Sequence, residues 1–151
     1  PSFFMQNLST THKKEIKENN EIFIPAGNGE TNFIDIRDIA EVGKNVILED
    51  GHINKAYELT GPENLNYYEI ADIMSEVLDK GITYKDTSIF KFFKRKRSEG
   101  YTTMHTLVMI GLYSASKYGS VAKKTDALKR LISSDPINVR QFVKDHKEIW
   151  L

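Results

Sequence analysis

Apolar and polar positions along most of the chain repeat with the spacing of amphipathic helices. Apolar residues that return every three or four positions predict helices, and short apolar runs bounded by turn residues predict strands. The predicted helices span residues 2–18, 37–50, 66–81, 87–100, 101–119, 125–132 and 138–150. The predicted strands span residues 22–24, 32–36, 55–61 and 82–84. Helices between short strands indicate crossover connections and a small, mostly parallel sheet.

Capping residues mark the ends of several of these helices. The predicted N-caps are Asp38, Thr125 and the first residues of two capping boxes, Asn66–Glu69 and Asn138–Gln141. Gly81 is predicted to end the helix at 66–81 in a left-handed conformation.

The glycine-rich stretch AGNGET, residues 26–31, joins the first two predicted strands. It is not followed by the Lys-Ser/Thr pair of a phosphate-binding loop, so we interpret it as a loop or a hairpin turn. Three or four short strands make a small sheet for so many helices. A further portion of sheet outside this chain would explain the imbalance.

Composition narrows the class of protein. The 151 residues carry 21 basic and 21 acidic side chains, so no net charge favours nucleic acid or a membrane surface. There is no cysteine, and the four histidines are too scattered to suggest a metal site. No apolar run is long enough to span a bilayer and no signal peptide opens the chain, so we expect a cytoplasmic protein. The chain begins abruptly with Pro rather than Met, which suggests a piece of a longer protein.

The sequence YSASK, residues 113–117, matches the Tyr-x-x-x-Lys pair of short-chain dehydrogenases. A helical wheel places Tyr113 and Lys117 on the side that faces solvent or another part of the protein. The opposite, core-facing stripe is predicted to contain Met104, Leu107, Val108, Gly111, Leu112 and Ala115. No dinucleotide-binding turn lies upstream, and two fixed residues specify little, so we interpret the match as a coincidence.

Two further features have structural interpretations. The basic, aromatic segment FKFFKRKR, residues 90–97, could contact RNA, an acidic partner or a phosphate, but a solvated helix face with partly buried Phe side chains is favoured. His52 and His105 lack sequence partners for acid–base work, so we expect surface or hydrogen-bonded histidines.

Four segments occur in an order that carries a family resemblance: PSFFMQN, FIDIRDIAEV, KAYELTGPENLNYYEIADIMSEVLDKGITY and SSDPINVRQFVKDHKEIW. They resemble the C-terminal half of NmrA-like proteins. This atypical short-chain dehydrogenase-like group includes NAD(P)H-dependent quinone and dye reductases and redox-sensing regulators. The resemblance covers essentially the whole chain, and RDIA together with ELTGPE is its most specific part.

The resemblance implies an α/β fold that is the C-terminal portion of a Rossmann-like fold, with a small sheet, flanking helices and a helical substrate-side region. Residues 1–151 would be a single partial domain that lacks the Gly-rich dinucleotide turn. Carried over by position, Pro1 and Phe3 would bind the cofactor, and Phe4 and Asn7 the substrate. The alternative is that Phe3 and Phe4 pack in the core. Asp38 and the turn Thr60–Glu63 are expected to be architectural.

The implied function is the substrate side of an NAD(P)H-dependent oxidoreductase whose substrate is a small electrophile such as a quinone or a dye. The catalytic residue stays unassigned. NAD(P) is expected in the intact protein and not on this chain alone, which would be inactive and could form a homodimer that covers exposed sheet edge and apolar surface. The alternative is a non-catalytic NAD(P)-sensing regulatory or protein-interaction module.

Overall fold

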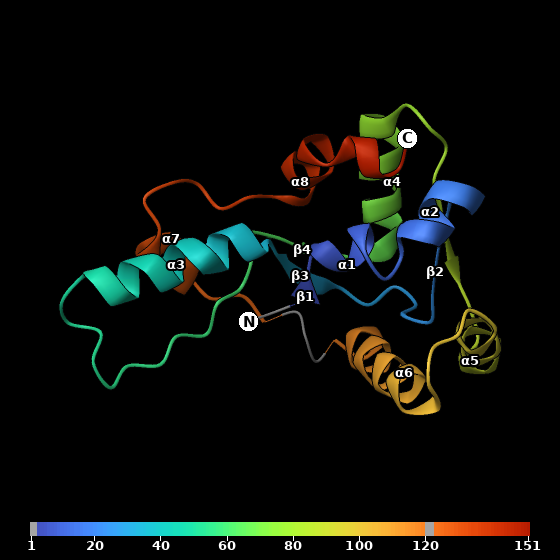
Figure 1. The fold of residues 1–151 in the computed structure, drawn as a ribbon, viewed down its shortest axis with the longest axis horizontal. Coiled ribbons are helices and arrows are strands. Elements are labelled where there is room, and N and C mark those ends of the chain that lie inside the picture. Colours follow the sequence, from blue (N-terminus) through green and yellow to red (C-terminus); the bar gives the residue numbers. More distant parts are fainter. Residues whose placement is uncertain (1–2, 120–122) are drawn as a thin grey trace.

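The computed structural model describes residues 3–119 and 123–151, and its strands form two small sheets flanked by helices (Figure 1). The first sheet has the order β1 (Phe3–Phe4), β3 (Thr31–Ile34) and β4 (Asn64–Leu65). The second pairs β2 (Glu21–Ile24) with β5 (Thr83–Asp86). The pairs β1–β3 and β2–β5 are parallel and β3–β4 is antiparallel, which confirms an α/β fold with small, mostly parallel sheets.

Helices make up most of the regular structure. They are α1 (Gln6–Ser9), α2 (Lys13–Asn19), α3 (Ile36–Leu48), α4 (Tyr67–Leu78), α5 (Ile89–Ser98), α6 (Thr103–Lys117), α7 (Ala127–Leu131), α8 (Val139–Asp145) and the 3-10 turn η1 (Lys147–Ile149). In Figure 1, α3 lies beside α7, α4 beside α8, and α5 beside α6, and these pairs are in contact. None of the helices in the described part of the chain is long and apolar enough to cross a membrane.

The helix predicted over residues 2–18 is wrong, because this segment forms β1, α1 and α2. β1 is drawn into the sheet by its parallel pairing with β3. The helical stretch is then interrupted between α1 and α2, where the hydroxyls of Ser9 and Thr10 donate to the carbonyl of Gln6 at 3.1 and 2.7 Å. Such side-chain bonds compete with continuation of the helix.

The strands predicted at 22–24 and 32–36 are confirmed as β2 and β3, but they do not form a hairpin. Each belongs to a different sheet, so the AGNGET stretch is a connecting loop. Gly29 in this loop lies directly against the carbonyl of Ser116 in α6, where a Cβ atom would not fit. The loop is therefore fixed against the C-terminal turn of α6.

The strand predicted over residues 55–61 is wrong, because this segment has no helix or strand. The side chain of Asn32, in β3, replaces a strand partner. Its amide donates to the carbonyls of Gly61 and Glu63 at 3.2 Å each, and its oxygen accepts from the Gly61 N–H at 2.5 Å. We call these hydrogen bonds of the Asn32 side chain to Gly61 and Glu63 the Asn32 clasp. Strand pairing begins only after it, at β4.

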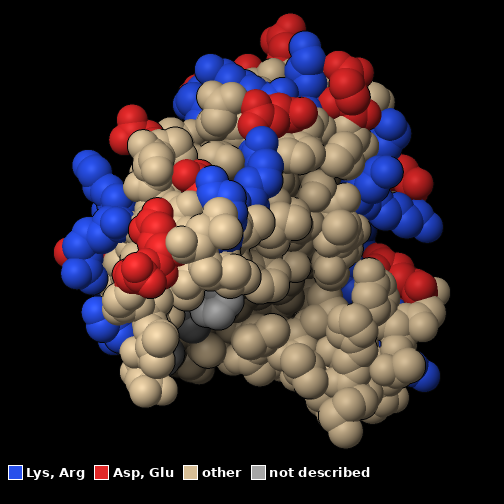
Figure 2. Space-filling view, turned by 60° about the vertical axis from the view of Figure 1, so that its left-hand side comes forward, with Lys and Arg blue, Asp and Glu red and all other residues tan. Residues whose placement is uncertain are grey.

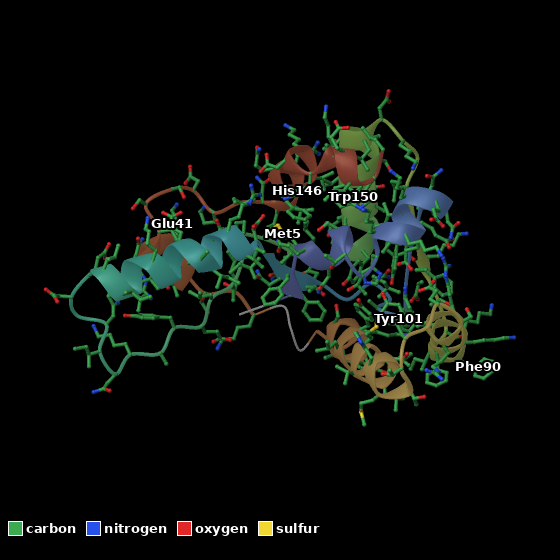
Figure 3. The ribbon with its side chains drawn as sticks, in the orientation of Figure 1. Met5, Glu41, Phe90, Tyr101, His146 and Trp150 are labelled. Atoms are coloured by element: carbon green, nitrogen blue, oxygen red, sulfur yellow. The ribbon has the colours of Figure 1, made fainter. Side chains whose placement is uncertain are left out.

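Two clusters of buried apolar side chains hold the elements together. The larger one lies among both sheets, α4, α5, α6 and α8, and includes Trp150, whose indole N–H donates to the carbonyl of Leu8 at 3.1 Å. Figure 3 shows Met5 and Trp150 within the body of the molecule and Phe90 projecting outward from α5. The smaller cluster joins α3 and α7 and contains Ile34, Val42, Leu59, Ala127, Leu128 and Ile132.

The N-cap of α3 is Asp35 rather than the predicted Asp38. The Asp35 carboxylate accepts from the N–H of Arg37 at 2.8 Å. Asp38 lies inside the first turn, where it is buried and accepts from the N–H of Ile137 at 3.0 Å. Burial raises the pKa of Asp38 in spite of this bond. Asp38 is thus architectural, as expected, but it fixes a distant loop rather than a helix end.

The start of α4 agrees with the sequence prediction and its end does not. The capping box is confirmed: the Asn66 side chain accepts from the N–H of Tyr68 and Glu69, and the Glu69 carboxylate accepts from the Asn66 N–H. The helix ends at Asp79, which adopts the left-handed conformation with φ of 49°, two residues before the predicted Gly81.

The caps predicted for the last two helices are only partly correct. Thr125 does not cap α7, because its hydroxyl donates to the carbonyl of Glu58 at 2.6 Å. Asn138 does cap α8 by accepting from the Gln141 N–H at 2.8 Å. The Gln141 side chain donates to Asp145 instead of completing the box.

Helix α6 is oriented opposite to the prediction. The stripe expected to face the core is largely exposed: Met104 at 71%, Leu107 at 51%, Val108 at 54% and Leu112 at 49%. The buried face instead contains Thr106, Met109, Tyr113 and Ser116. Both faces have helical periodicity, so periodicity alone could not decide which one is covered.

The Asn32 clasp requires a glycine at position 61, because a Cβ atom there would collide with the carbonyl oxygen of Phe33. We expect Gly61→Ala to destabilise the fold by about 3 kcal/mol, since β3 or the turn must shift. Gly43→Ala, in open space on α3, should instead stabilise by up to about 1 kcal/mol. Urea unfolding measures both, and equal stability of the two variants would contradict the clasp.

Candidate functional site

The predicted site residues lie around the turn from β1 into α1. Pro1 is outside the described residues. Phe3 is half-buried, with its ring centroid 6.3 Å from those of Phe33 and Tyr113, so it packs against the core. Phe4 points to the other side and is 39% exposed. Asn7 is half-buried on α1, and its side chain makes no hydrogen bond to the described residues.

The carboxyl ends of β1 and β3 meet at the edge where ligands bind in many open α/β sheets. Gln6 joins the two turns by donating to Asp35 at 3.0 Å and accepting from the N–H of Ile36 at 3.2 Å. Burial would raise the pKa of Asp35, but hydrogen bonds from Arg37 and Gln6 outweigh it and hold the pKa below its usual value. Arg37 also pairs with Asp145 at 2.7 Å, so this edge is tied to α8.

Tyr113 and Lys117 do not form a catalytic pair in this fold. Contrary to the sequence expectation, Tyr113 is only 4% exposed, and its hydroxyl lies 2.5 Å from Nε2 of His12. Burial and the nearby Glu15 charge raise the pKa of Tyr113 far above its usual value. Lys117 is exposed and its stem lies over Gly27. A catalytic tyrosine needs a lowered pKa and access to substrate, and Tyr113 has neither.

Tyr113 ends a buried polar network. Nδ1 of His12 lies 2.7 Å from a Glu15 carboxylate oxygen, and the other oxygen lies 2.9 Å from Nζ of Lys96. A carboxylate only accepts, so Nδ1 of His12 donates to Glu15, and Nε2 forms a hydrogen bond with the Tyr113 hydroxyl. Burial would raise the pKa of Glu15, but His12 and Lys96 together lower it below its usual value.

The basic segment at 90–97 is mostly used for internal contacts. Lys96 is 1% exposed, and Arg95 pairs with Glu21 at 2.5 Å and with Glu99 at 3.2 Å. The predicted helix is confirmed, but its face is less solvated than expected, and Phe90 is 76% exposed rather than partly buried while Phe92 is fully buried. The sequence did not reveal that two of the cations face inward.

The remaining histidines also have local partners. His52 lies 2.8 Å from the Tyr57 hydroxyl, and His105 stacks edge-on against Tyr101.

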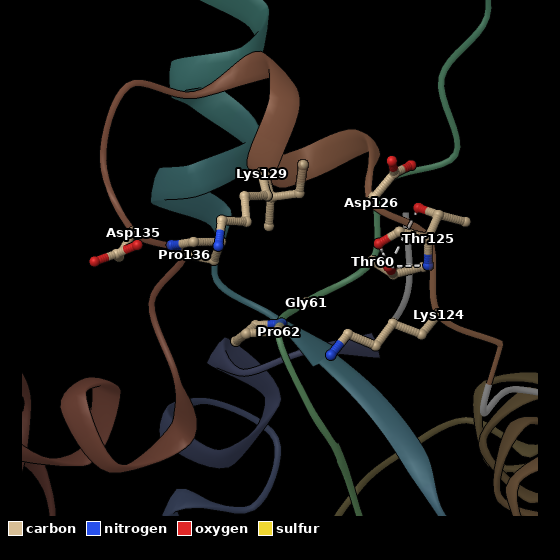
Figure 4. Close-up of a pocket in the computed structure, with 10 residues that line it drawn as sticks. Thr60, Gly61, Pro62, Lys124, Thr125, Asp126, Lys129, Asp135 and Pro136 are labelled. Carbon is tan, nitrogen blue, oxygen red and sulfur yellow. Dashed lines mark hydrogen bonds between the residues drawn. The ribbon is translucent and has the colours of Figure 1, made fainter.

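A cavity of about 590 Å³ lies next to the carboxyl end of β3 (Figure 4). Two parts of the chain that are far apart in the sequence surround it, and they contribute Thr60, Gly61, Pro62, Lys124, Thr125, Asp126, Leu128, Lys129, Asp135 and Pro136. Its volume is within the range of about 300–1,000 Å³ typical of small-molecule sites. The predicted site residues Phe3, Phe4 and Asn7 are not among its lining residues.

The charged side chains of this cavity point in different directions. In Figure 4 the amino group of Lys129 lies next to Pro136, and that of Lys124 lies on the other side of Gly61 and Pro62. The carboxylates of Asp126 and Asp135 point away from the cavity. The sequence interpretation identified the turn at Thr60–Glu63 but missed both lysines, because nothing in the sequence spacing joins 124–129 to that turn.

Charge is unevenly spread over the surface. Figure 2 shows a face that is hollowed in its lower half, where most side chains are uncharged, while basic and acidic side chains gather above and at the sides. Apolar side chains more than half exposed occur on several elements: Ile47, Leu48, Ile53, Ile89, Phe90, Met104, Leu107 and Val108.

Sequence comparison relates the chain to oxidoreductases. No protein-family model matches it. It is 28% identical to the uncharacterized oxidoreductase YesF of Bacillus subtilis, over 99% of this chain and 53% of that protein. It is 29% identical to an NAD(P)H azoreductase of Xenophilus azovorans, over 97% of this chain and 51% of that protein. The chain thus spans about half the length of the curated relatives it matches.

Solved structures show the same fold. The triphenylmethane reductase of Citrobacter, described for bioremediation of triphenylmethane dyes, aligns with a TM-score of 0.87 and 24% identity, over 97% of this chain and 51% of that one. The NADPH-dependent quinone oxidoreductase of Escherichia coli, complexed with NADPH, aligns with a TM-score of 0.87 and 20% identity over the same shares. The described residues therefore adopt the fold of about half of such a reductase.

The buried network around Glu15 makes stability depend on pH. The folded-state pKa of Glu15 is below the ordinary 4.5, so its contribution is present above about pH 4.5 and is lost as pH falls through the folded value. Glu15→Gln leaves Lys96 buried without a full partner and should cost about 3–5 kcal/mol at pH 7. In this variant the free energy of unfolding should fall less steeply as the pH is lowered.

Urea unfolding between pH 3 and 7 measures both effects. The matched control is Glu18→Gln, an exposed carboxylate on the same helix, which should change stability by less than about 0.5 kcal/mol. Equal stability of the two variants, or an unchanged acid-side slope in Glu15→Gln, would contradict the assigned role.

Proposed function

We propose that this chain is the C-terminal, substrate-side portion of an NAD(P)H-dependent oxidoreductase of the NmrA-like type, and that residues 1–151 form a single partial domain of it. The observation that carries the proposal is the match of nearly the whole chain to reductases about twice as long. The reduced molecule would be a small electrophile such as a quinone or a dye, which agrees with the names of the azoreductase and of the two reductases with the same fold.

The described residues do not fit the phosphates of a dinucleotide. The sequence has no Gly-x-Gly-x-x-Gly turn, and the loop with Gly27 and Gly29 is packed against Lys117 and Ser116 of α6. No backbone nest in this loop is open to a pyrophosphate. We therefore assign the phosphate site to a part of the protein outside this chain, and expect the chain alone to be inactive and without bound NAD(P).

The nicotinamide end of the cofactor would fit this chain better than the phosphates do. Pro1 and Phe3 would border the cofactor, and Phe4 and Asn7 the substrate. Phe4 offers an exposed flat apolar surface at the carboxyl end of β1, and Asn7 has an amide without a hydrogen bond to the described residues. When bound, the nicotinamide supplies a hydride. Phe4 would orient a planar substrate, and the Asn7 amide would donate to its carbonyl oxygen.

The full-length protein should oxidise NADPH in the presence of a soluble quinone. Phe4→Ala should lower kcat/KM by about tenfold, since an orienting contact is lost. Phe90→Ala, which removes an exposed aromatic ring from α5, is the matched control and should have no effect. Titration calorimetry of the 151-residue chain alone should detect no NADPH binding.

Three results would contradict parts of this proposal. NADPH binding by the full-length protein without turnover would favour the regulatory, NAD(P)-sensing alternative. An unchanged kcat/KM in Phe4→Ala would remove this residue from the substrate site. Micromolar NADPH binding by the isolated chain would show that a phosphate site exists within it.

We further propose that the isolated chain forms a homodimer through the outer face of α6. Met104, Leu107, Val108 and Leu112 present an apolar stripe without charged residues, so the same face of a second copy can pack against it about a two-fold axis. The alternative occupant is the part of the protein outside this chain, and the test distinguishes the two.

Sedimentation of the isolated chain should show a concentration-dependent dimer. Leu107→Glu should weaken it by at least about tenfold, because a charge would be buried at the contact. Ile47→Glu, at an 83% exposed apolar position on α3, should leave it unchanged. A chain that stays monomeric at all concentrations, or a dimer that tolerates Leu107→Glu, would rule out this contact.

A further inference from the structure

The cavity beside Gly61 has features of a binding site that the reductase proposal does not use. We propose that it binds a small organic anion, with a carboxylate, sulfonate or phosphate group held by Lys124 and Lys129 and an apolar body against Pro62, Leu128 and Pro136. The inference concerns binding by this chain alone and stands independently of the reductase proposal.

The floor of the cavity is held in place before any ligand binds. Gly61 is fixed to Asn32 by hydrogen bonds in both directions. The adjacent Thr60 hydroxyl lies 3.1 Å from the carbonyl of Thr125 and accepts from the Thr125 N–H at 2.9 Å. These bonds join the turn at Thr60–Gly61 to the segment that carries the lysines. A preorganised site of this kind loses little conformational entropy on binding.

Two lysines and two aspartates line the cavity, and the aspartates point away from it. Neither Lys124 nor Lys129 forms an ion pair with the described residues, whereas the neighbouring Lys123 pairs with Glu58. Asp126 pairs with Arg130 at 3.3 Å, and Asp135 points away from the cavity in Figure 4. An anionic group bound in the cavity would therefore find two ammonium partners that are not already paired with the described residues.

The apolar part of the lining selects for an organic molecule rather than a bare inorganic ion. Leu128 is 2% exposed and belongs to the cluster between α3 and α7, so its position is fixed by packing. Pro62 and Pro136 are half-buried and rigid, and they add apolar walls. A flat aromatic or aliphatic body can therefore leave water while its anionic group reaches the lysines.

The test is a titration of the isotope-labelled chain with naphthoate, followed by NMR. The amide signals of Gly61, Thr125 and Lys129 should shift together and saturate. Replacement of both lysines, Lys124→Gln with Lys129→Gln, should weaken the affinity by about tenfold. The charge-preserving pair Lys124→Arg with Lys129→Arg should restore it.

A matched control removes two exposed lysines elsewhere. Lys91→Gln with Lys94→Gln, on α5, lowers the net charge by the same amount and should leave naphthoate affinity unchanged. The uncharged analogue naphthalenemethanol should shift the cavity signals at least about tenfold more weakly than naphthoate.

Three results would overturn the inference. The shifts could occur elsewhere, for example on the exposed face of α6, with the cavity signals unmoved. The affinity could survive the double Lys→Gln replacement. The uncharged analogue could bind the cavity as well as naphthoate, which would show that the lysines do not select an anion.

Discussion

The structure depends most on the buried carboxylate of Glu15. It receives hydrogen bonds from His12, Lys96 and the backbone N–H of Phe23 at 2.7, 2.9 and 3.2 Å, and His12 passes the contact on to Tyr113. One charge thus fixes α2, β2, α5 and α6 relative to one another. In the described residues every buried side-chain nitrogen or oxygen has a hydrogen-bond partner, so this network can be buried without an orphaned group.

The same network explains why α6 is oriented against its apolar pattern. Exposing Tyr113 and covering the Leu107 side would remove the partner of His12 and the packing of Phe3 and Phe92 on the tyrosine ring. It would also move Ser116 away from Thr31, to which it is hydrogen-bonded. Several specific contacts therefore outweigh the gain from burying a few aliphatic side chains.

Sequence patterns predicted the elements whose signals are local. The capping box at Asn66 and the apolar periodicity located α4, and periodicity located α5 and α6. The patterns failed where a distant residue determines the local structure. β1 forms only because β3 pairs with it, and Gly61 is not in a strand because it is hydrogen-bonded to the Asn32 side chain. The cavity was missed for the same reason, because Lys124 and Lys129 lie near Gly61 only once the chain is folded. The roles of Phe3, Phe4 and Asn7 rest on family resemblance and remain a proposal.

The hydrogen bonds and strand pairing described above also explain why apolar side chains of α6 and β1 are exposed. Specific polar contacts fix which face of α6 is inward, so the second apolar face must point outward whatever its composition. β1 pairs on one side only within the described sheet, and Phe4 next to it is exposed. Apolar area in water costs about 25 cal/mol per Å², so such surfaces are retained where something covers them. The dimer proposed above would cover the outward stripe of α6, whose opposite face has its buried polar groups satisfied within the described residues.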